Sequence, residues 1–97
     1  MTTLYLLQYD VVEDYIARRT AHRDAHLSLA NAAAERGELL LGGAVDAGAG
    51  GALLVFTGRA AAEAFAAADP YVSNGVVVAW RVREWSIAAG SAGKASR

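Results

Sequence analysis

Two side chains that lie far apart in the sequence, His26 and Asp69, could together move a proton. A carboxylate that accepts a hydrogen bond from an imidazole fixes the tautomer of the ring and stabilises its protonated form. An imidazole held in this way takes up and returns a proton near neutral pH, which is general acid–base catalysis. Two simpler roles stay open: Asp69 could organise the turn before Pro70, and His26 could be a hydrogen-bonded core imidazole.

Two arginines accompany His26 on a predicted helix. At about 100° per residue, Arg19, Arg23 and His26 fall within an arc of roughly 60°. This arc borders the face that we expect to be buried, formed by Ile16, Thr20, Leu27, Ala30 and Ala34. Guanidinium groups beside an imidazole suit an anionic or phenolate ligand. Ordinary pairs with acids on the same helix are the alternative explanation for both arginines.

Metal and phosphate sites have weaker support. His22 and His26 are spaced as two metal ligands on a helix are, but no glutamate follows His22 and no third ligand is evident. The chain has no cysteine, which excludes disulfides and thiolate metal sites. Gly42-Gly43 could let backbone approach a ligand, yet no phosphate-loop spacing accompanies the pair. We therefore expect no metal and no cofactor, and keep Gly43 as a candidate substrate contact beside its use in a turn.

The pattern of apolar residues predicts four strands and two helices. The strands are expected at Thr3–Tyr9, Glu38–Val45, Leu53–Thr57 and Val76–Trp85. A helix is expected over Glu13–Arg36, ended by Gly37, and an alanine-rich one over Arg59–Ala68, which must stop before Pro70. Turns are expected at 46–51 and 71–75. On the last strand, Val76, Val78, Trp80 and Val82 should share one face, and Ala79, Arg81 and Arg83 the other.

The order β-α-β-β-α-β predicts an α+β, ferredoxin-like fold, with a four-stranded antiparallel sheet and both helices on one face. With 97 residues the chain is one domain, which we place at 1–87, followed by a disordered tail at 88–97. Much of the 55% hydrophobic content is alanine, so the core is scarce. A bare sheet face in a chain with so small a core predicts a homodimer packed sheet against sheet.

Charge and hydropathy exclude several classes of protein. The net charge of −1 argues against nucleic-acid and membrane-surface binding, which need a basic excess. No segment approaches the roughly 20 apolar residues of a membrane span. The sequence opens in a strand-like run without a secretory pattern, so we expect a cytoplasmic protein.

Over nearly its whole length except the tail, the chain resembles the YciI-like family, also called the YCII-related domain. The matching features are Arg23-x-x-His26-Leu27, Gly37, Leu39-Leu40, Gly42-Gly43, a strand ending in Phe56, Asp69-Pro70-Tyr71 and Gly75-Val76. The resemblance implies a dimeric α+β barrel of two ferredoxin-like subunits, with the family's His–Asp pair on His26 and Asp69. Some relatives look like lyases or dehydrohalogenases of ring-hydroxylated aromatics. Ala44 stands where the family has a characteristic proline, so the resemblance leaves the substrate open.

These observations lead to a cofactor-independent enzyme that transfers a proton on a small anionic or ring-hydroxylated molecule, of lyase, dehydrohalogenase or isomerase type. In this hypothesis His26 is the general base and acid, Asp69 orients it, and Arg23 steadies a developing oxyanion. Arg19, Tyr71 and Gly43 are the further substrate contacts that we expect. The alternative is a non-catalytic dimeric module that binds a small molecule or serves as an accessory subunit. A weaker third hypothesis is a monooxygenase acting on quinols.

Overall fold

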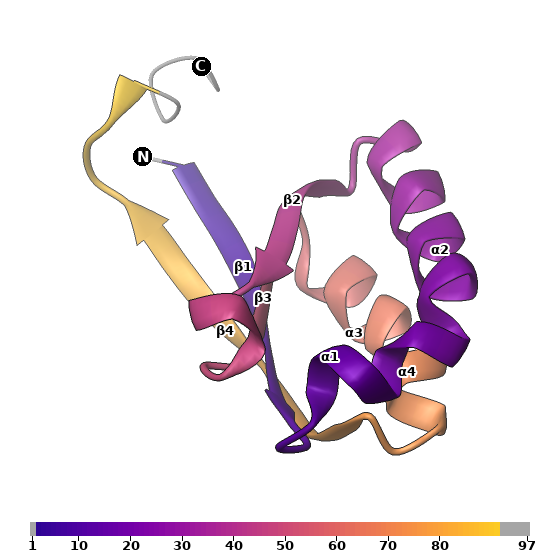
Figure 1. Ribbon diagram of the computed structural model, residues 1–97. Coiled ribbons are helices and arrows are strands. Elements are labelled where there is room, and N and C mark those ends of the chain that lie inside the picture. The colour runs from indigo at the N-terminus through magenta and orange to yellow at the C-terminus, as the bar shows by residue number, and fades with distance from the viewer. Residues whose placement is uncertain (1, 92–97) are drawn as a thin grey trace.

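Four strands rich in aromatic and branched residues pair into one antiparallel sheet in the computed structural model, which describes residues 2–91. The strands are β1 (Thr2–Val11), β2 (Leu39–Ala44), β3 (Ala52–Phe56) and β4 (Val77–Ile87). Their order in the sheet is β2-β3-β1-β4, and the helices cover one face (Figure 1). This arrangement fits the predicted ferredoxin-like fold, and each strand lies close to its expected position.

The first crossover is an interrupted helix, whereas the sequence predicted one continuous helix over 13–36. It comprises α1 (Tyr15–Arg18), a 3₁₀ turn η1 (Arg19–His22) and α2 (Arg23–Glu35). Gly37, with φ of 76°, follows the end of α2 as predicted. The second crossover helix, α3 (Arg59–Ala68), has the bounds expected from its alanine-rich sequence.

The first crossover buries a different face from the one predicted. Ile16 is 46% exposed and Leu27 38% exposed, and Thr20 is exposed as well. The inward stripe instead carries Tyr15, Arg19, His22, His26, Leu29 and Ala33. The prediction was wrong because it assigned mostly apolar residues to the interior, whereas Arg19, His22 and His26 occupy half of this stripe. Such an inversion of the usual pattern is typical of a functional surface.

A short helix, α4 (Pro70–Ser73), occupies the start of the predicted turn at 71–75. Pro70 stands at its first position, where the missing N–H costs nothing. The side chain of Asp69 caps the helix by accepting a hydrogen bond from the backbone N–H of Tyr71, at 3.0 Å. The turn prediction is confirmed at Asn74 and Gly75 and is wrong at 71–73, because Asp-Pro is also the start signal of a helix.

The alternation predicted for the last strand holds in its middle and fails at its beginning. Trp80 lies opposite Tyr9, and Val82 opposite Leu7, on the face that meets the helices, while Arg81 and Arg83 lie on the other face. A register shift next to Asp10 breaks the pattern, so that Val78 is 63% exposed.

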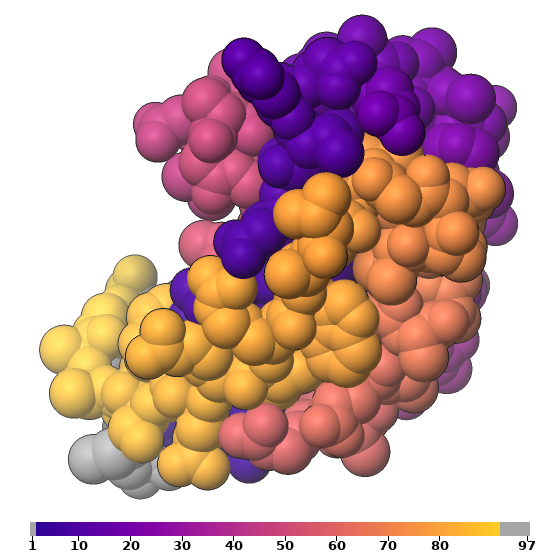
Figure 2. All heavy atoms as spheres, turned by 90° about the horizontal axis from the view of Figure 1, so that it is seen from below, coloured from indigo at the N-terminus to yellow at the C-terminus, as the bar shows by residue number. Residues whose placement is uncertain are grey.

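The core lies between the helices and the adjacent sheet face, around Leu7, Phe56, Phe65 and Tyr71. Figure 2 shows the far end of β4 standing away from this body. Most of the predicted tail falls in 92–97, outside the described residues. Among the described helices, none has the length and hydropathy that a membrane crossing requires.

Candidate active site

The fold brings His26 and Asp69 together, one from α2 and the other from the junction of α3 and α4. Nδ1 of His26 lies 2.9 Å from Oδ1 and 3.0 Å from Oδ2 of Asp69. The Asp69 side chain is fully buried, and that of His26 is 13% exposed. A carboxylate in this position requires Nδ1 to carry the proton, which leaves Nε2 as the nitrogen that can exchange one.

Asp69 is held by two further hydrogen bonds besides that of His26. The hydroxyl of Tyr9 donates to Oδ2 at 2.6 Å, and the Tyr71 backbone N–H donates to Oδ1. All three partners donate to Asp69, an arrangement that satisfies an ionised carboxylate in a buried place. Burial, reinforced by the neighbouring Asp69 carboxylate, raises the pKa of Tyr9 far above its ordinary value, so that Tyr9 remains a neutral donor.

The imidazole of His26 is fixed by aromatic rings as well. The ring of Tyr71 stacks on it, with centroids 3.9 Å apart and planes 4° from parallel. Phe65 meets it edge-on at 6.0 Å. These contacts leave the ring little freedom to rotate away from Asp69.

Two arginines extend the site along the first crossover. Nη1 of Arg23 donates to the hydroxyl of Tyr71, and Nη1 of Arg19 to that of Tyr15, each at 3.4 Å. Burial raises the pKa of Tyr71, and the Arg23 guanidinium opposes that shift. Among residues 2–91, neither arginine forms an ion pair with an acid, although both are partly buried. Partly buried cations without a carboxylate partner are suited to an anionic ligand.

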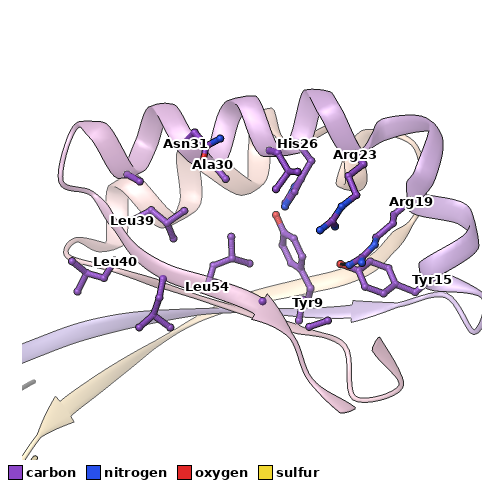
Figure 3. A pocket seen from close by; sticks show the side chains of 17 residues that line it. Tyr9, Tyr15, Arg19, Arg23, His26, Ala30, Asn31, Leu39, Leu40 and Leu54 are labelled. Atoms are coloured by element: carbon purple, nitrogen blue, oxygen red, sulfur yellow. Dashed lines mark hydrogen bonds between the residues drawn. The ribbon is translucent and has the colours of Figure 1, made fainter. Parts of the chain in front are cut away.

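A cavity of about 390 Å³ opens in front of these groups, between the first crossover and β2 (Figure 3). Its volume is in the range of small-molecule pockets. The lining residues are Tyr9, Tyr15, Arg19, Arg23, His26, Leu27, Ala30, Asn31, Ala34, Leu39, Leu40, Leu41, Gly42, Gly43, Ala44, Ala52 and Leu54.

His26 lines this cavity, and Nε2 is the ring nitrogen that is not bound to Asp69. Nε2 forms no hydrogen bond with any described residue. No buried side-chain nitrogen or oxygen of the described chain lacks a partner, so an unpartnered Nε2 must be accessible. The reactive nitrogen therefore faces the space that a ligand would occupy.

The structure places the residues predicted from the sequence in two groups. Arg19, Arg23, His26 and Gly43 line the cavity, whereas Tyr71 is fully buried behind the imidazole. Tyr71 was predicted to contact the substrate; in the structure it instead packs against the His26 ring and supports it.

Tyr9 and Tyr15 also line the cavity, and neither was predicted from the sequence to belong to the site. Strand alternation places Tyr9 on the helix-facing side of β1 together with Leu7, a signal that could have identified it. Tyr15 lies in the interrupted part of the crossover, where helical periodicity gave the wrong inward face.

The described residues offer no cluster of three or more His, Asp or Glu side chains that could hold a metal ion. His22 and His26, which have the spacing of metal ligands, therefore find no third ligand within residues 2–91.

Comparisons with known proteins agree with this architecture. The family model of the YCII-related domain matches residues 1–86. Among solved structures, one that is similar in fold is 5-chloro-2-hydroxyhydroquinone dehydrochlorinase from Burkholderia phenoliruptrix AC1100, in complex with 2,5-dihydroxybenzoquinone. It superposes with a TM-score of 0.69 and 22% sequence identity, over 86% of this chain and 93% of the other. Among curated proteins, none matches the sequence.

Proposed function

The chain belongs to the YCII-related domain family, and from this premise we propose that it is a small cofactor-independent enzyme that transfers a proton on an anionic, ring-hydroxylated molecule. The proposed reaction is an elimination, of lyase or dehydrohalogenase type. The observation that carries the proposal is the His26–Asp69 pair, with Nδ1 bound to the carboxylate and Nε2 open to the cavity.

His26 is the proposed general base and acid. Its Nε2 accepts the proton that the substrate releases, and the imidazolium so formed lies against the buried Asp69 carboxylate. Because Tyr9 and Tyr71 hold that carboxylate in place, the charge is stabilised without reorganisation. Tyr71 also keeps the imidazole plane fixed by stacking.

Arg23 and Arg19 are the proposed groups that bind the negative charge of the substrate. Both line the cavity on the same side of His26 and carry no acidic partner among residues 2–91. A ring oxygen that gains negative charge as its proton leaves would be stabilised by a guanidinium nearby.

In the proposed elimination, Nε2 takes a proton from the substrate as a leaving group departs with the electron pair of its bond to carbon. The electron pair of the broken bond to hydrogen forms the new π-bond, so the products are an unsaturated molecule, a halide ion and the proton held by His26. General acid–base catalysis contributes about 10²–10⁴-fold. The mechanism therefore suits an acidic proton and a good leaving group.

A 5-chloro-2-hydroxyhydroquinone dehydrochlorinase has a similar fold, which makes that compound a suitable test substrate. Its structure holds a dihydroxybenzoquinone, a planar molecule with ring oxygens. At 22% identity the similarity establishes the fold alone, and the reaction is proposed from the site.

Chloride release from 5-chloro-2-hydroxyhydroquinone, measured under nitrogen with an ion-selective electrode, tests the proposal. The wild type should release chloride, His26→Ala should lose at least about 10²-fold in rate, and the matched control His22→Ala should retain it. Equal rates for wild type and His26→Ala would overturn the mechanism. If the wild type binds the compound and releases no chloride, the binding-module alternative is supported instead. Oxygen consumption in air would point to the monooxygenase alternative.

We also propose that two chains form a homodimer through the sheet face that points away from the helices. Leu41, Val55 and Leu6 form a cross-strand row on this face, and Trp85 lies opposite Leu4 on it. Leu41 is 67% exposed and Trp85 46% exposed, since no element of residues 2–91 covers them. Arg81 and Arg83 lie on the same face, so its apolar part is limited to these exposed side chains, which a second copy would cover.

A further inference from the structure

The cavity has two chemically different ends. Figure 3 shows Arg19 and Arg23 on one side of His26, and Leu39, Leu40 and Leu54 on the other. The cationic end lies along η1 and the start of α2, where no acid of the described residues neutralises the guanidinium groups. A ligand that fills the cavity must therefore present a charge at one end and hydrocarbon at the other.

The apolar end forms an arm that leads away from the imidazole along α2. It is bordered by Leu27, Ala30, Asn31 and Ala34 on the helix and by Leu40 and Gly42 on β2, so these side chains are apolar apart from the amide of Asn31. Ala34 is eight residues beyond His26, which corresponds to about 12 Å at 1.5 Å per residue. The arm therefore extends well past the reacting nitrogen.

Small residues keep this arm open. A Cβ at Gly42 would lie 3.0 Å from Cγ of Leu54, so this position tolerates little beyond glycine. Ala30 and Ala34 place only methyl groups on the opposite wall. At these three positions the helix and the strand lack the large side chains that would close the space.

Resting on the proposed function, we infer that the substrate is an amphipathic anion: a ring or enolisable acyl group with one anionic oxygen at the arginine end and an alkyl or aryl substituent along the arm. A small ring with polar substituents on every side would leave the leucine-lined arm unfilled. A hydrocarbon substituent removes that apolar surface from water, which is favourable in proportion to the area buried. The arginines fix the orientation, with the acidic proton next to Nε2.

Straight-chain carboxylates from butanoate to decanoate are suitable probes, with the corresponding primary alcohols as uncharged controls. Isothermal titration calorimetry should show affinity rising about four-fold per methylene until the chain exceeds the arm, and weaker binding of each alcohol. Arg23→Gln should weaken all carboxylates by a similar factor and leave the dependence on chain length intact.

Two variants test whether the hydrocarbon chain of the carboxylate binds in the arm. Ala34→Leu, at an exposed helix position, fills the arm and should abolish the gain from longer chains while butanoate binds as before. Leu40→Ser should lower the gain per methylene. The matched control is Ala25→Leu, on the same helix, exposed and outside the cavity lining.

Affinity that does not depend on chain length in the wild type, or a dependence that survives in Ala34→Leu, would overturn the inference. His26→Ala separates this inference from the proposed function. If His26→Ala keeps the dependence of affinity on chain length and loses chloride release, the proposed reaction and the apolar arm are both supported. If wild type and His26→Ala bind the series alike and neither releases chloride, the proposed reaction fails and the assignment of the arm stands.

Discussion

Asp69 combines three tasks at the residue scale, because one carboxylate orients His26, accepts from Tyr9 and caps α4. The sequence contained enough to predict its pairing with His26, since both residue types and the topology pointed to it. The contribution of Tyr9 was not predicted, because a tyrosine on a strand is usually a core residue and only the register shows where its hydroxyl points.

Asp69→Asn should lower turnover by about 10²–10⁴-fold while the protein stays folded. Asparagine is a good N-cap and still accepts from the Tyr71 N–H, but its amide carries no charge to stabilise the imidazolium. Steady-state kinetics together with circular dichroism would measure both effects. Wild-type turnover in this variant would show that Asp69 serves α4 alone.

Tyr9→Phe should lower the free energy of unfolding by about 1.5–3 kcal/mol near neutral pH, because a hydrogen bond to a charged, buried group is lost. The difference should shrink at alkaline pH. Burial and the Asp69 carboxylate raise the pKa of Tyr9 above its ordinary value of 10.0, so the folded wild type keeps a proton that the unfolded chain releases. Above the ordinary tyrosine pKa, the free energy of unfolding of the wild type therefore decreases with pH more steeply than that of Tyr9→Phe. The difference between the two slopes is up to about 1.4 kcal/mol per pH unit.

Urea unfolding of both proteins between neutral and strongly alkaline pH measures this difference directly. A constant gap between wild type and Tyr9→Phe across that range would contradict the assignment of a neutral, buried Tyr9.

At the scale of elements, the sequence predicted which segments form strands and helices but misplaced the inward face of the first crossover. Hydrophobic periodicity assumes that the apolar stripe is buried, whereas here the polar Arg19, Arg23 and His26 are partly buried and line the cavity. The apolar Leu27, Ala30 and Ala34 line the open cavity as well. Hydrophobic periodicity therefore fails on this crossover because polar site residues occupy its inward face. A failure of this kind is itself an indication of a functional face.

The turn between β2 and β3 holds Tyr9 in place through a close approach of backbone. Gly51 has φ of 83°, and a Cβ there would overlap the carbonyl oxygen of Tyr9. We expect Gly51→Ala to lower the free energy of unfolding by at least about 1–3 kcal/mol, the usual cost of such a conformation for another residue.

Gly43→Ala is the matched control for this substitution, since its Cβ would meet nothing within 4 Å and its φ is not positive. Urea unfolding should show this control to be near neutral. Equal effects of the two substitutions would contradict the role of the close approach at Gly51.

For the molecule as a whole, the ferredoxin-like architecture followed from the order of elements, and the bare sheet face followed from the architecture. Assembly does not follow from the order of elements, because only the pattern of exposed side chains indicates where a second copy would pack. Leu41 and Trp85, which are 67% and 46% exposed, supply that pattern.

Trp85→Asp should convert the proposed dimer into a monomer, because a charge would be buried in an apolar interface. Ile16→Asp is the matched control: the two side chains are equally exposed, at 46%, and Ile16 lies on α1, away from the sheet face. Light scattering coupled to size-exclusion chromatography measures both masses. A monomeric wild type, or a dimeric Trp85→Asp, would contradict the proposed interface.

In the proposed mechanism, His26 presents an unprotonated Nε2 to the cavity because Asp69 holds the proton on Nδ1. Long-range ¹H–¹⁵N NMR of the two histidines, recorded on the alkaline side of neutrality, distinguishes the tautomers directly. We expect His26 to be protonated on Nδ1 alone in the wild type, and His22, which has no hydrogen-bond partner among residues 2–91, to show the mixture of a free imidazole. In Asp69→Asn the preference of His26 for Nδ1 should weaken. A wild-type His26 that carries its proton on Nε2 could not accept one from a substrate, and this result would contradict the account.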